Sequence, residues 1–344
     1  MLLTSASVSG GSLSETIRLE AEDEMAKLQD LYEGRSDAPT ILMSQEEASA
    51  FVQQNIDAAL FDCDGVLYRT PVPIPGAKEC IESMMKEGKK VLFVTNNAGV
   101  NRKQLREKLS KILDVDSLVD EQMISASYSA AQFLKNEVNC GGMTGKRVHV
   151  IGSGGLCEEL KSFGFEVSGG PSSDKPEMDR GDLASYEFPE SPIDAIVVGH
   201  DVAFTFRKLS IANVLLQKNP LARFVATNRD SFDLVGGDGR HIPGNGCIVA
   251  ALEYCSRRTA LNTGKPSKDL LGVIQQEHNL DLSRTMFVGD RLDTDIKFGK
   301  DTGMISVLVM TGVTTADKLA SVGEGNDEEP LPTIVVSHVG KLVR

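Results

Sequence analysis

Two aspartates one residue apart are the first residues of this chain that could do chemistry together. Asp62 and Asp64 follow the apolar run at 58–61, and Gly65 comes directly after them. A glycine lets the chain turn sharply and bring backbone N–H groups close to a ligand. Carboxylates in such a place can serve as nucleophile, acid or base. Aspartate is also common in turns, so the pair alone fits either a chemical site or an ordinary turn.

A hydroxyl and two amides follow the next apolar run. Thr95, Asn96 and Asn97 come directly after residues 91–94. Such side chains at the end of a strand suit the oxygens of a phosphate group without adding charge. Threonine and asparagine also cap helices, so this motif is a weak signal alone.

A lysine and a second group of acids lie nearer the C-terminus. Lys265 stands in the turn Gly-Lys-Pro-Ser, ahead of an expected helix. Asp290 follows an apolar run that ends in glycine, and Asp293 and Asp295 lie three and five residues further on. Taken singly, the lysine fits a surface turn and the acids fit the N-terminus of a helix.

The elements that must position these residues are short strands alternating with helices. Most apolar runs precede a stretch with helical spacing, as at 77–86 and 105–112. This alternation predicts parallel sheets covered on both faces, and right-handed crossovers make a doubly wound, Rossmann-like α/β sheet the expected fold. Ligands bind such sheets at the carboxyl ends of the strands. The apolar runs are 58–61, 91–95, 148–152, 195–199, 224–227, 286–290 and 305–310.

The long interval between the second and third motifs has strand–helix units of its own, which predicts an inserted α/β cap domain. The expected parts are an N-terminal extension (1–40), a core (41–139 and 244–344) and the cap (140–243). Within the extension, residues 13–32 have the spacing of an amphipathic helix. The polar segment 171–191 lacks periodicity and predicts a surface loop.

Composition excludes several classes of partner. The 344 residues carry a net charge of −13, which argues against affinity for nucleic acid. No apolar run approaches the roughly 20 residues that span a bilayer, so no membrane segment is expected. The six scattered cysteines indicate reduced intracellular thiols. Residues 1–14 faintly resemble a transit peptide but lack arginine, so we expect a cytoplasmic protein, with an organelle such as the chloroplast as the alternative.

Together the four motifs resemble those of the haloacid dehalogenase superfamily. They read FDCDGVLY, VTNNA, GKPS and GDRLDTDI, and the resemblance covers about residues 55–344. ATNRD at 226–230 and TGVTT at 311–315 are similar to the branch with phosphoglycolate, pyridoxal-phosphate and p-nitrophenyl-phosphate phosphatases. The resemblance implies a C2-type cap over the site, which would exclude water and favour small phosphorylated metabolites. It also implies a homodimer formed through the cap.

The resemblance assigns a role to each motif. Asp62 would be the nucleophile that forms an aspartyl-phosphate intermediate. Asp64 would protonate the leaving alcohol and then act as the base for the hydrolytic water. Thr95 and Lys265 would bind the phosphoryl oxygens, with Asn96 and Asn97 as further substrate-binding residues.

Magnesium is the cofactor that the resemblance implies. Its expected ligands are the Asp62 side chain, the Asp64 backbone carbonyl and Asp290, whereas Asp295 would act behind them by orienting water or Lys265. Four ionised aspartates against one lysine would repel a phosphate unless a divalent cation were bound. We therefore expect chelator to abolish turnover.

Phosphoglycolate is the substrate that the motifs favour, with pyridoxal phosphate or broad specificity towards 4-nitrophenyl phosphate as alternatives. A cap that reads phosphoglycolate needs a cation for its carboxylate, and the candidates are Arg207, Lys208, Arg229 and Arg240. A non-catalytic protein that binds phosphometabolites is the alternative from another class, although it would be expected to lose Asp62, Asp64 or Lys265. A phosphotransferase or mutase with the same motifs stays open.

Overall fold

The computed structural model describes residues 10–35, 38–173, 178–235, 240–322 and 329–344. The chain forms two compact units, and each is described by itself. Unit 1 comprises residues 1–94, 107–122 and 280–344, and unit 2 comprises residues 95–106 and 123–279. The division into extension, core and cap is a different one and stays a prediction. Of the segment that resembles a transit peptide, residues 1–9 lie outside the described residues.

The first sheet has seven strands in the order β1-β16-β15-β14-β2-β5-β6. Strand β2 pairs in parallel with β14 and with β5, so that Phe61 lies opposite both Val288 and Phe93. The residues after these strands therefore emerge at one edge of the sheet. The strands are β1 (Thr40–Ile41), β2 (Ala58–Phe61), β5 (Lys90–Thr95), β6 (Met123–Ser125), β14 (Thr285–Gly289), β15 (Ile305–Val309) and β16 (Ile334–Val336).

Helices and one small hairpin complete this part of the chain. Ser44 caps α2 by accepting the Glu47 N–H, which is the start signal expected of a serine three residues before a glutamate. The helices are α1 (Gly10–Leu31), α2 (Gln45–Asn55), α3 (Ala77–Lys86), α4 (Arg102–Leu113), α11 (Lys297–Thr302) and α12 (Ala316–Ala320), and the hairpin joins β3 (Tyr68–Arg69) to β4 (Val72–Pro73).

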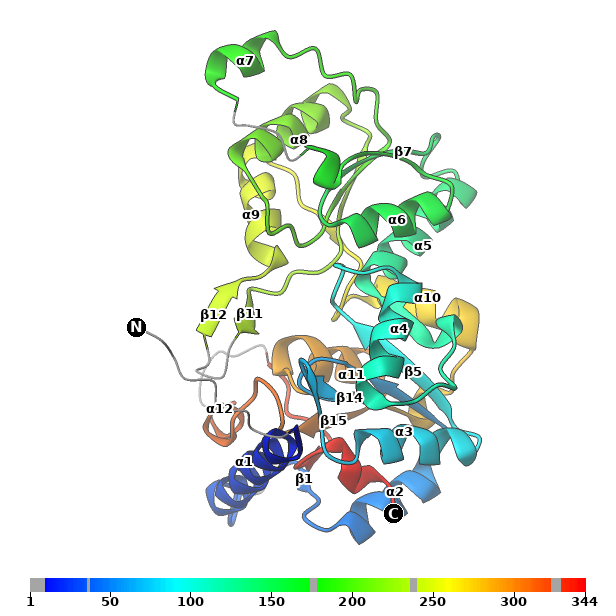
Figure 1. The fold of residues 1–344 in the computed structure, drawn as a ribbon, viewed down its shortest axis with the longest axis vertical. Helices are drawn as coiled ribbons and strands as arrows, with labels where there is room; N and C mark the ends of the chain where they lie inside the picture. Colours follow the sequence, from blue (N-terminus) through cyan, green and yellow to red (C-terminus); the bar gives the residue numbers. More distant parts are fainter. Residues whose placement is uncertain (1–9, 36–37, 174–177, 236–239, 323–328) are drawn as a thin grey trace. The chain divides into compact units, whose positions relative to one another are not determined.

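The N-terminal helix α1 is part of unit 1 and lies beside α12 (Figure 1). The expected helix at 13–32 is confirmed as α1, and its spacing of three to four residues explains its buried stripe of Ile17, Ala21, Met25 and Leu28, which Tyr32 continues just beyond the end of the helix. Met25 and Leu28 share a hydrophobic cluster with Leu292, which lies just after Asp290. Helix α1 therefore supports the segment that carries the C-terminal acids.

Unit 2 is built on a five-stranded parallel sheet in the order β13-β10-β9-β7-β8. Its strands are β7 (Arg147–Ile151), β8 (Glu166–Gly169), β9 (Ala195–Val198), β10 (Arg223–Ala226) and β13 (Leu261–Asn262). An antiparallel hairpin joins β11 (Phe232–Val235) to β12 (Arg240–Pro243). Two parallel sheets in one chain confirm the predicted α/β class.

Helices of unit 2 pack on this sheet through two apolar clusters. One cluster joins α8 and α9 to β9 and β10, and the other joins α5 and α6 to β7. The segment 171–191 differs from the expected loop, because Asp179 and Asp182 form a reciprocal capping box that starts the short helix α7. The helices are α5 (Ala126–Asn139), α6 (Gly154–Ser162), α7 (Arg180–Ser185), α8 (Phe206–Lys218), α9 (Asn245–Ser256) and α10 (Lys268–His278).

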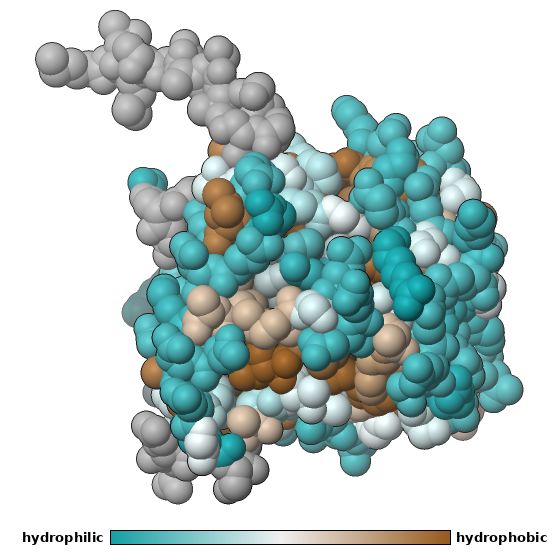
Figure 2. Space-filling model, turned by 90° about the horizontal axis from the view of Figure 1, so that it is seen from below, coloured by the Kyte–Doolittle hydropathy of each residue, from teal (hydrophilic) through white to brown (hydrophobic). Residues whose placement is uncertain are grey.

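The surface is mainly polar where it is seen in Figure 2, with apolar residues in a broken band between hydrophilic ones. Among the described residues, none of the helices combines the length and the apolar character needed to cross a bilayer.

Candidate active site

Asp62 stands at the carboxyl end of β2 and is 8% exposed. Its N–H donates to the carbonyl of Val288 on β14 at 2.9 Å, which continues the pairing of the two strands beyond Phe61. Gly65 follows with a φ of +80°, and a Cβ atom built there would lie 2.5 Å from Oδ2 of Asp290. This position therefore requires glycine for its conformation and for the close approach of the acid.

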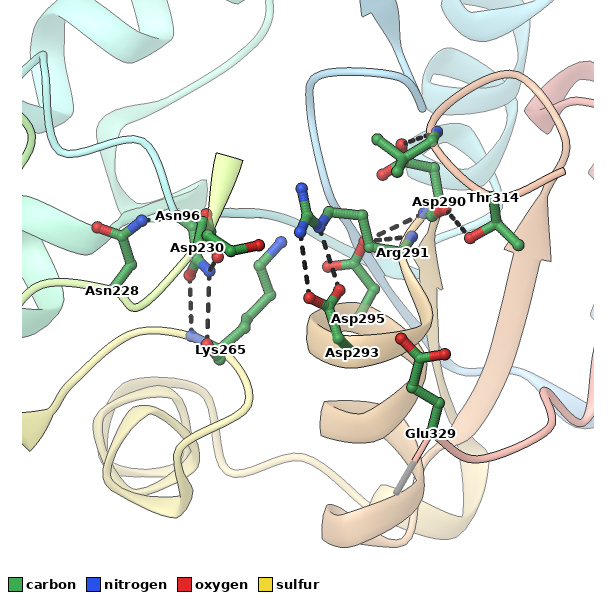
Figure 3. A network of polar contacts seen from close by, with 12 residues as sticks. Asn96, Asn228, Asp230, Lys265, Asp290, Arg291, Asp293, Asp295, Thr314 and Glu329 are labelled. Atoms are coloured by element: carbon green, nitrogen blue, oxygen red, sulfur yellow. Dashed lines mark hydrogen bonds and ion pairs between the residues drawn. The ribbon is translucent and has the colours of Figure 1, made fainter. Parts of the chain in front are cut away.

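Asp290, which follows β14, is held by the segment that follows β15. Its Oδ2 accepts the N–H of Val313 at 2.7 Å. Its backbone carbonyl accepts the hydroxyl of Thr314 at 2.6 Å (Figure 3). A Cβ atom at Gly312 would overlap the Asp290 carboxylate, so this glycine is also needed for the contact. The TGVTT motif thus has a physical role, since it encloses the acid.

Asp295 is fully buried in the π-helical turn Leu292–Ile296. Its Oδ2 accepts the N–H groups of Asp290 and Arg291, both at 3.1 Å, and so fixes the backbone that carries Asp290. Asp293, on the same turn, forms an ion pair with Arg291 at 3.1 Å instead (Figure 3). The two acids of one motif therefore have different environments.

Three buried carboxylates converge in unit 1. Asp62, Asp290 and Asp295 each offer an oxygen, and these atoms lie within 4.8 Å of one another. Burial raises the pKa of the Asp290 carboxyl well above its usual value, and the neighbouring charges of Asp295 and Asp62 raise it further. Clustered carboxylate oxygens are the donors that a hard divalent cation such as Mg²⁺ prefers. The residues present therefore fit a cation of this kind.

Asp64 is exposed, in contrast to the three clustered acids. Its Oδ2 accepts the hydroxyl of Tyr68 at 2.9 Å, and the hydroxyl of Thr70 lies 3.5 Å from its Oδ1. Burial raises the pKa of Tyr68, so the phenol keeps its proton and remains a donor. An exposed carboxylate with one fixed oxygen is well suited to exchange a proton with a ligand.

The lysine motif and the first asparagine meet in unit 2. Oδ1 of Asn96 accepts the backbone N–H of Lys265 at 2.8 Å, and Nδ2 of Asn96 donates to the Lys265 carbonyl at 3.4 Å. Lys265 is 2% exposed, so it is not the solvated lysine of a surface turn. The predicted helix after this turn is α10, which Ser267 caps.

Asp230 is a functional candidate that the sequence did not single out. Its Oδ1 accepts Nδ2 of Asn96 at 2.8 Å, and its Oδ2 accepts Nδ2 of Asn228 at 3.0 Å (Figure 3). Asn245 donates to Oδ1 of Asn228 at 3.1 Å, which extends the network. The only sequence signal was the polar group after the apolar run at 224–227, where ATNRD begins.

The predicted site residues thus fall into two groups within the described residues. Unit 1 brings Asp62 together with Asp290 and Asp295, and unit 2 brings Asn96 together with Lys265. Thr95, the last residue of β5, accepts the N–H of Asn97, whose own side chain is used to accept the N–H of Gly99. That all of them act on one phosphoryl group stays a prediction.

Comparison with known proteins identifies the family. A model described as haloacid dehalogenase-like hydrolase matches residues 59–166, and a HAD-hydrolase-like model matches residues 262–342. Phosphoglycolate phosphatase 2 of Arabidopsis thaliana is 37% identical over 307 residues, which are 89% of this chain and 99% of that protein. The chain belongs to the haloacid dehalogenase-like hydrolases.

Other members of this family are also similar over most of their length. Human chronophin is 35% identical over 283 residues, 82% of this chain and 90% of that protein. The solved structure of a p-nitrophenyl phosphatase from Archaeoglobus fulgidus aligns with a TM-score of 0.69 at 27% identity, covering 84% of this chain and 98% of that one. The predicted branch of capped phosphatases and the predicted enzyme class, phosphoric monoester hydrolase, are therefore confirmed.

Proposed function

We propose that the chain hydrolyses a small phosphate monoester with Mg²⁺ and through an aspartyl-phosphate on Asp62. The observation that carries this proposal is the buried cluster of Asp62, Asp290 and Asp295, with the exposed acid Asp64 two residues after Asp62. A carboxylate nucleophile, a cation site and a proton donor are the parts that phosphoryl transfer to aspartate needs.

The first step joins an oxygen of Asp62 to phosphorus while the bond from phosphorus to the ester oxygen breaks. Asp64 gives its proton to that ester oxygen, and the alcohol leaves neutral. In the second step Asp64 takes a proton from water, and the water oxygen attacks phosphorus while the bond from phosphorus to the Asp62 oxygen breaks, which releases inorganic phosphate. The Asp62 carboxylate is then regenerated.

The Asp62 and Asp290 carboxylates and the Asp64 carbonyl would hold Mg²⁺, whose charge offsets the repulsion between these acids and an incoming phosphate. Asp295 acts behind them, because its carboxylate is used on the N–H groups of Asp290 and Arg291. The pKa of Asp290, raised by burial and by the neighbouring acids, supports this need for positive charge.

Lys265 and Thr95 bind the phosphoryl oxygens in this proposal. The Asn96 side chain fixes the backbone of Lys265, so the lysine is positioned before substrate arrives. Asn97 is tied into a local turn through Gly99, and it would contact substrate only by giving up that bond.

Phosphoglycolate is the substrate we propose, because the Arabidopsis relative with that name matches nearly the whole chain. Pyridoxal phosphate and 4-nitrophenyl phosphate are the alternatives. Two of the four cations considered for a substrate carboxylate already have acidic partners. Lys208 is buried in an ion pair with Asp201 at 2.7 Å, and Arg229 pairs with Glu253. We further propose a cytoplasmic homodimer, with the chloroplast as the alternative location.

A panel of phosphate monoesters tests the function. Phosphate release is measured with phosphoglycolate, pyridoxal phosphate and 4-nitrophenyl phosphate, with Mg²⁺ and with excess chelator. We expect the highest kcat/KM for phosphoglycolate and no turnover with chelator. Full activity in chelator would contradict the metal requirement. Binding of these esters without any phosphate release would instead support a non-catalytic binding protein.

A further inference from the structure

A buried tyrosine lies directly behind Asp64 in unit 1. Tyr68 is 1% exposed, and its hydroxyl donates to Oδ2 of Asp64 at 2.9 Å. The turn between them is closed by its own backbone, since the Gly65 N–H donates to the Tyr68 carbonyl at 2.8 Å and the Tyr68 N–H donates to the Cys63 carbonyl. The phenol is therefore fixed relative to the acid.

Lys108 of α4 determines which way the tyrosine proton points. Its Nζ donates to the Tyr68 hydroxyl oxygen at 2.9 Å and lies 4.3 Å from the centre of the ring. An ammonium group has only donors, so the tyrosine oxygen must accept from Lys108. The single O–H proton of Tyr68 is then directed to Asp64. The hydrogen bonds therefore run in one direction, from the Lys108 ammonium to the Tyr68 hydroxyl and from that hydroxyl to Oδ2 of Asp64.

We propose that Tyr68, oriented by Lys108, is a positioning residue for proton transfer by Asp64. Because Tyr68 holds Oδ2, the other oxygen, Oδ1, is the one that gives its proton to the ester oxygen as the phosphorus–oxygen bond breaks. Oδ1 faces only the Thr70 hydroxyl at 3.5 Å among the contacts of the described residues, and the Asp64 side chain is exposed. This inference rests on the proposed function of Asp64.

Substrates with different leaving groups separate this role from a structural one. An alcohol is a poor leaving group and needs the proton, whereas 4-nitrophenolate departs without it. In Tyr68→Phe we expect kcat/KM to fall about 10-fold for phosphoglycolate and less than about 3-fold for 4-nitrophenyl phosphate. Both losses are smaller than the roughly 100-fold or more that a general acid itself contributes, because Asp64 stays in place. An equal loss on both substrates, or no loss on either, would overturn the proposal.

Tyr32→Phe is the matched control. Tyr32 is also buried in unit 1, and its hydroxyl donates to the Leu319 carbonyl at 3.0 Å. The substitution removes the same atom from the same residue type, so a loss of stability alone would appear in both variants. We expect kcat/KM of Tyr32→Phe to match the wild type for both esters. A selective loss in this control would show that the readout reports stability, and the proposal would fall.

Lys108→Met provides a second test that keeps the phenol and also decides the matter if Tyr68→Phe does not fold. In Lys108→Met the Tyr68 proton loses its fixed direction. We therefore expect kcat/KM to fall more for phosphoglycolate than for 4-nitrophenyl phosphate, but by less than in Tyr68→Phe. Lys108→Arg keeps a donor and should restore part of this loss. A Lys108→Met enzyme with unchanged kcat/KM on both esters would refute the orienting role. If the wild type released phosphate from no ester at all, the proposed function itself would fail, whatever these variants show.

Discussion

The acids of unit 1 and the amides of unit 2 are held by different means, although both belong to the predicted site. Asp290 and Asp295 accept backbone N–H groups, and with Asp62 they concentrate negative charge in a buried place. Asn96 instead holds the backbone of Lys265 through its amide and donates to Asp230. The first group could hold a metal ion, whereas the second is a hydrogen-bonded support. Substitutions should therefore affect chemistry and metal affinity in unit 1 and substrate affinity in unit 2.

Removing the proposed nucleophile should have the largest effect. Asp62→Asn is nearly isosteric, and we expect kcat to fall about 10⁴-fold or more because the amide cannot form the acyl phosphate. Phosphate release under saturating substrate gives the rate, and circular dichroism checks the fold. Asp57→Asn, which changes an exposed acid paired with Arg284, should retain activity. Retained turnover in Asp62→Asn would exclude this residue as the nucleophile.

The cation requirement of the acid cluster is tested by binding rather than by rate. We expect Asp290→Asn to weaken Mg²⁺ binding about 100-fold, at the upper end of the effects of residues that support a metal. Titration calorimetry and the Mg²⁺-dependent rise in Tm report it. Asp293→Asn, in the same turn but paired with Arg291, should bind like the wild type. Equal affinity in both variants would remove Asp290 from the metal site.

Each unit contains a buried histidine whose pKa is lowered by burial, His149 in unit 2 and His338 in unit 1. Burial of His149 on β7 lowers its pKa to about 4, from an ordinary value near 6.5. Between these values the unfolded chain binds the proton more readily, so stability is present above about pH 6.5 and is lost as the pH falls towards 4. We expect about 2 kcal/mol less stability at pH 5 than at pH 7 from this group. Urea unfolding of wild type and His149→Gln measures it, and the same pH slope in both would contradict the assignment.

The support of Lys265 should give the smallest effect. Asp230→Ala removes the carboxylate that accepts one of the two Nδ2 hydrogen bonds of Asn96. We expect KM to rise about 10-fold with a lesser change in kcat, in keeping with the cost of one unmade hydrogen bond. Asp233→Ala, on the neighbouring hairpin and 45% exposed, is the matched control. A fall in kcat without a change in KM would place Asp230 in the chemistry instead.

The sequence predicted the acid cluster better than the amide network. Asp62 and Asp290 each follow an apolar run, and the carboxyl ends of parallel strands meet at one edge of a sheet, so the motifs taken together predicted their convergence. The pairing of β2 with β14 is what brings them together. Asp230 lies 134 residues from Asn96, and its role depends on side-chain hydrogen bonds that leave no periodic signal. Helix α1 was likewise predicted only in part. Its amphipathic spacing was visible, but its packing beside Leu292 was not.

The covalent intermediate on Asp62 is the central claim, and trapping it is the most direct measurement. The enzyme with Mg²⁺ and phosphoglycolate is quenched in acid within the first turnovers, digested and analysed by mass spectrometry. We predict one added phosphoryl group on the peptide that contains Asp62, absent from Asp62→Asn. A phosphoryl group on another residue, or turnover with no phosphorylated enzyme at any quench time, would contradict this account.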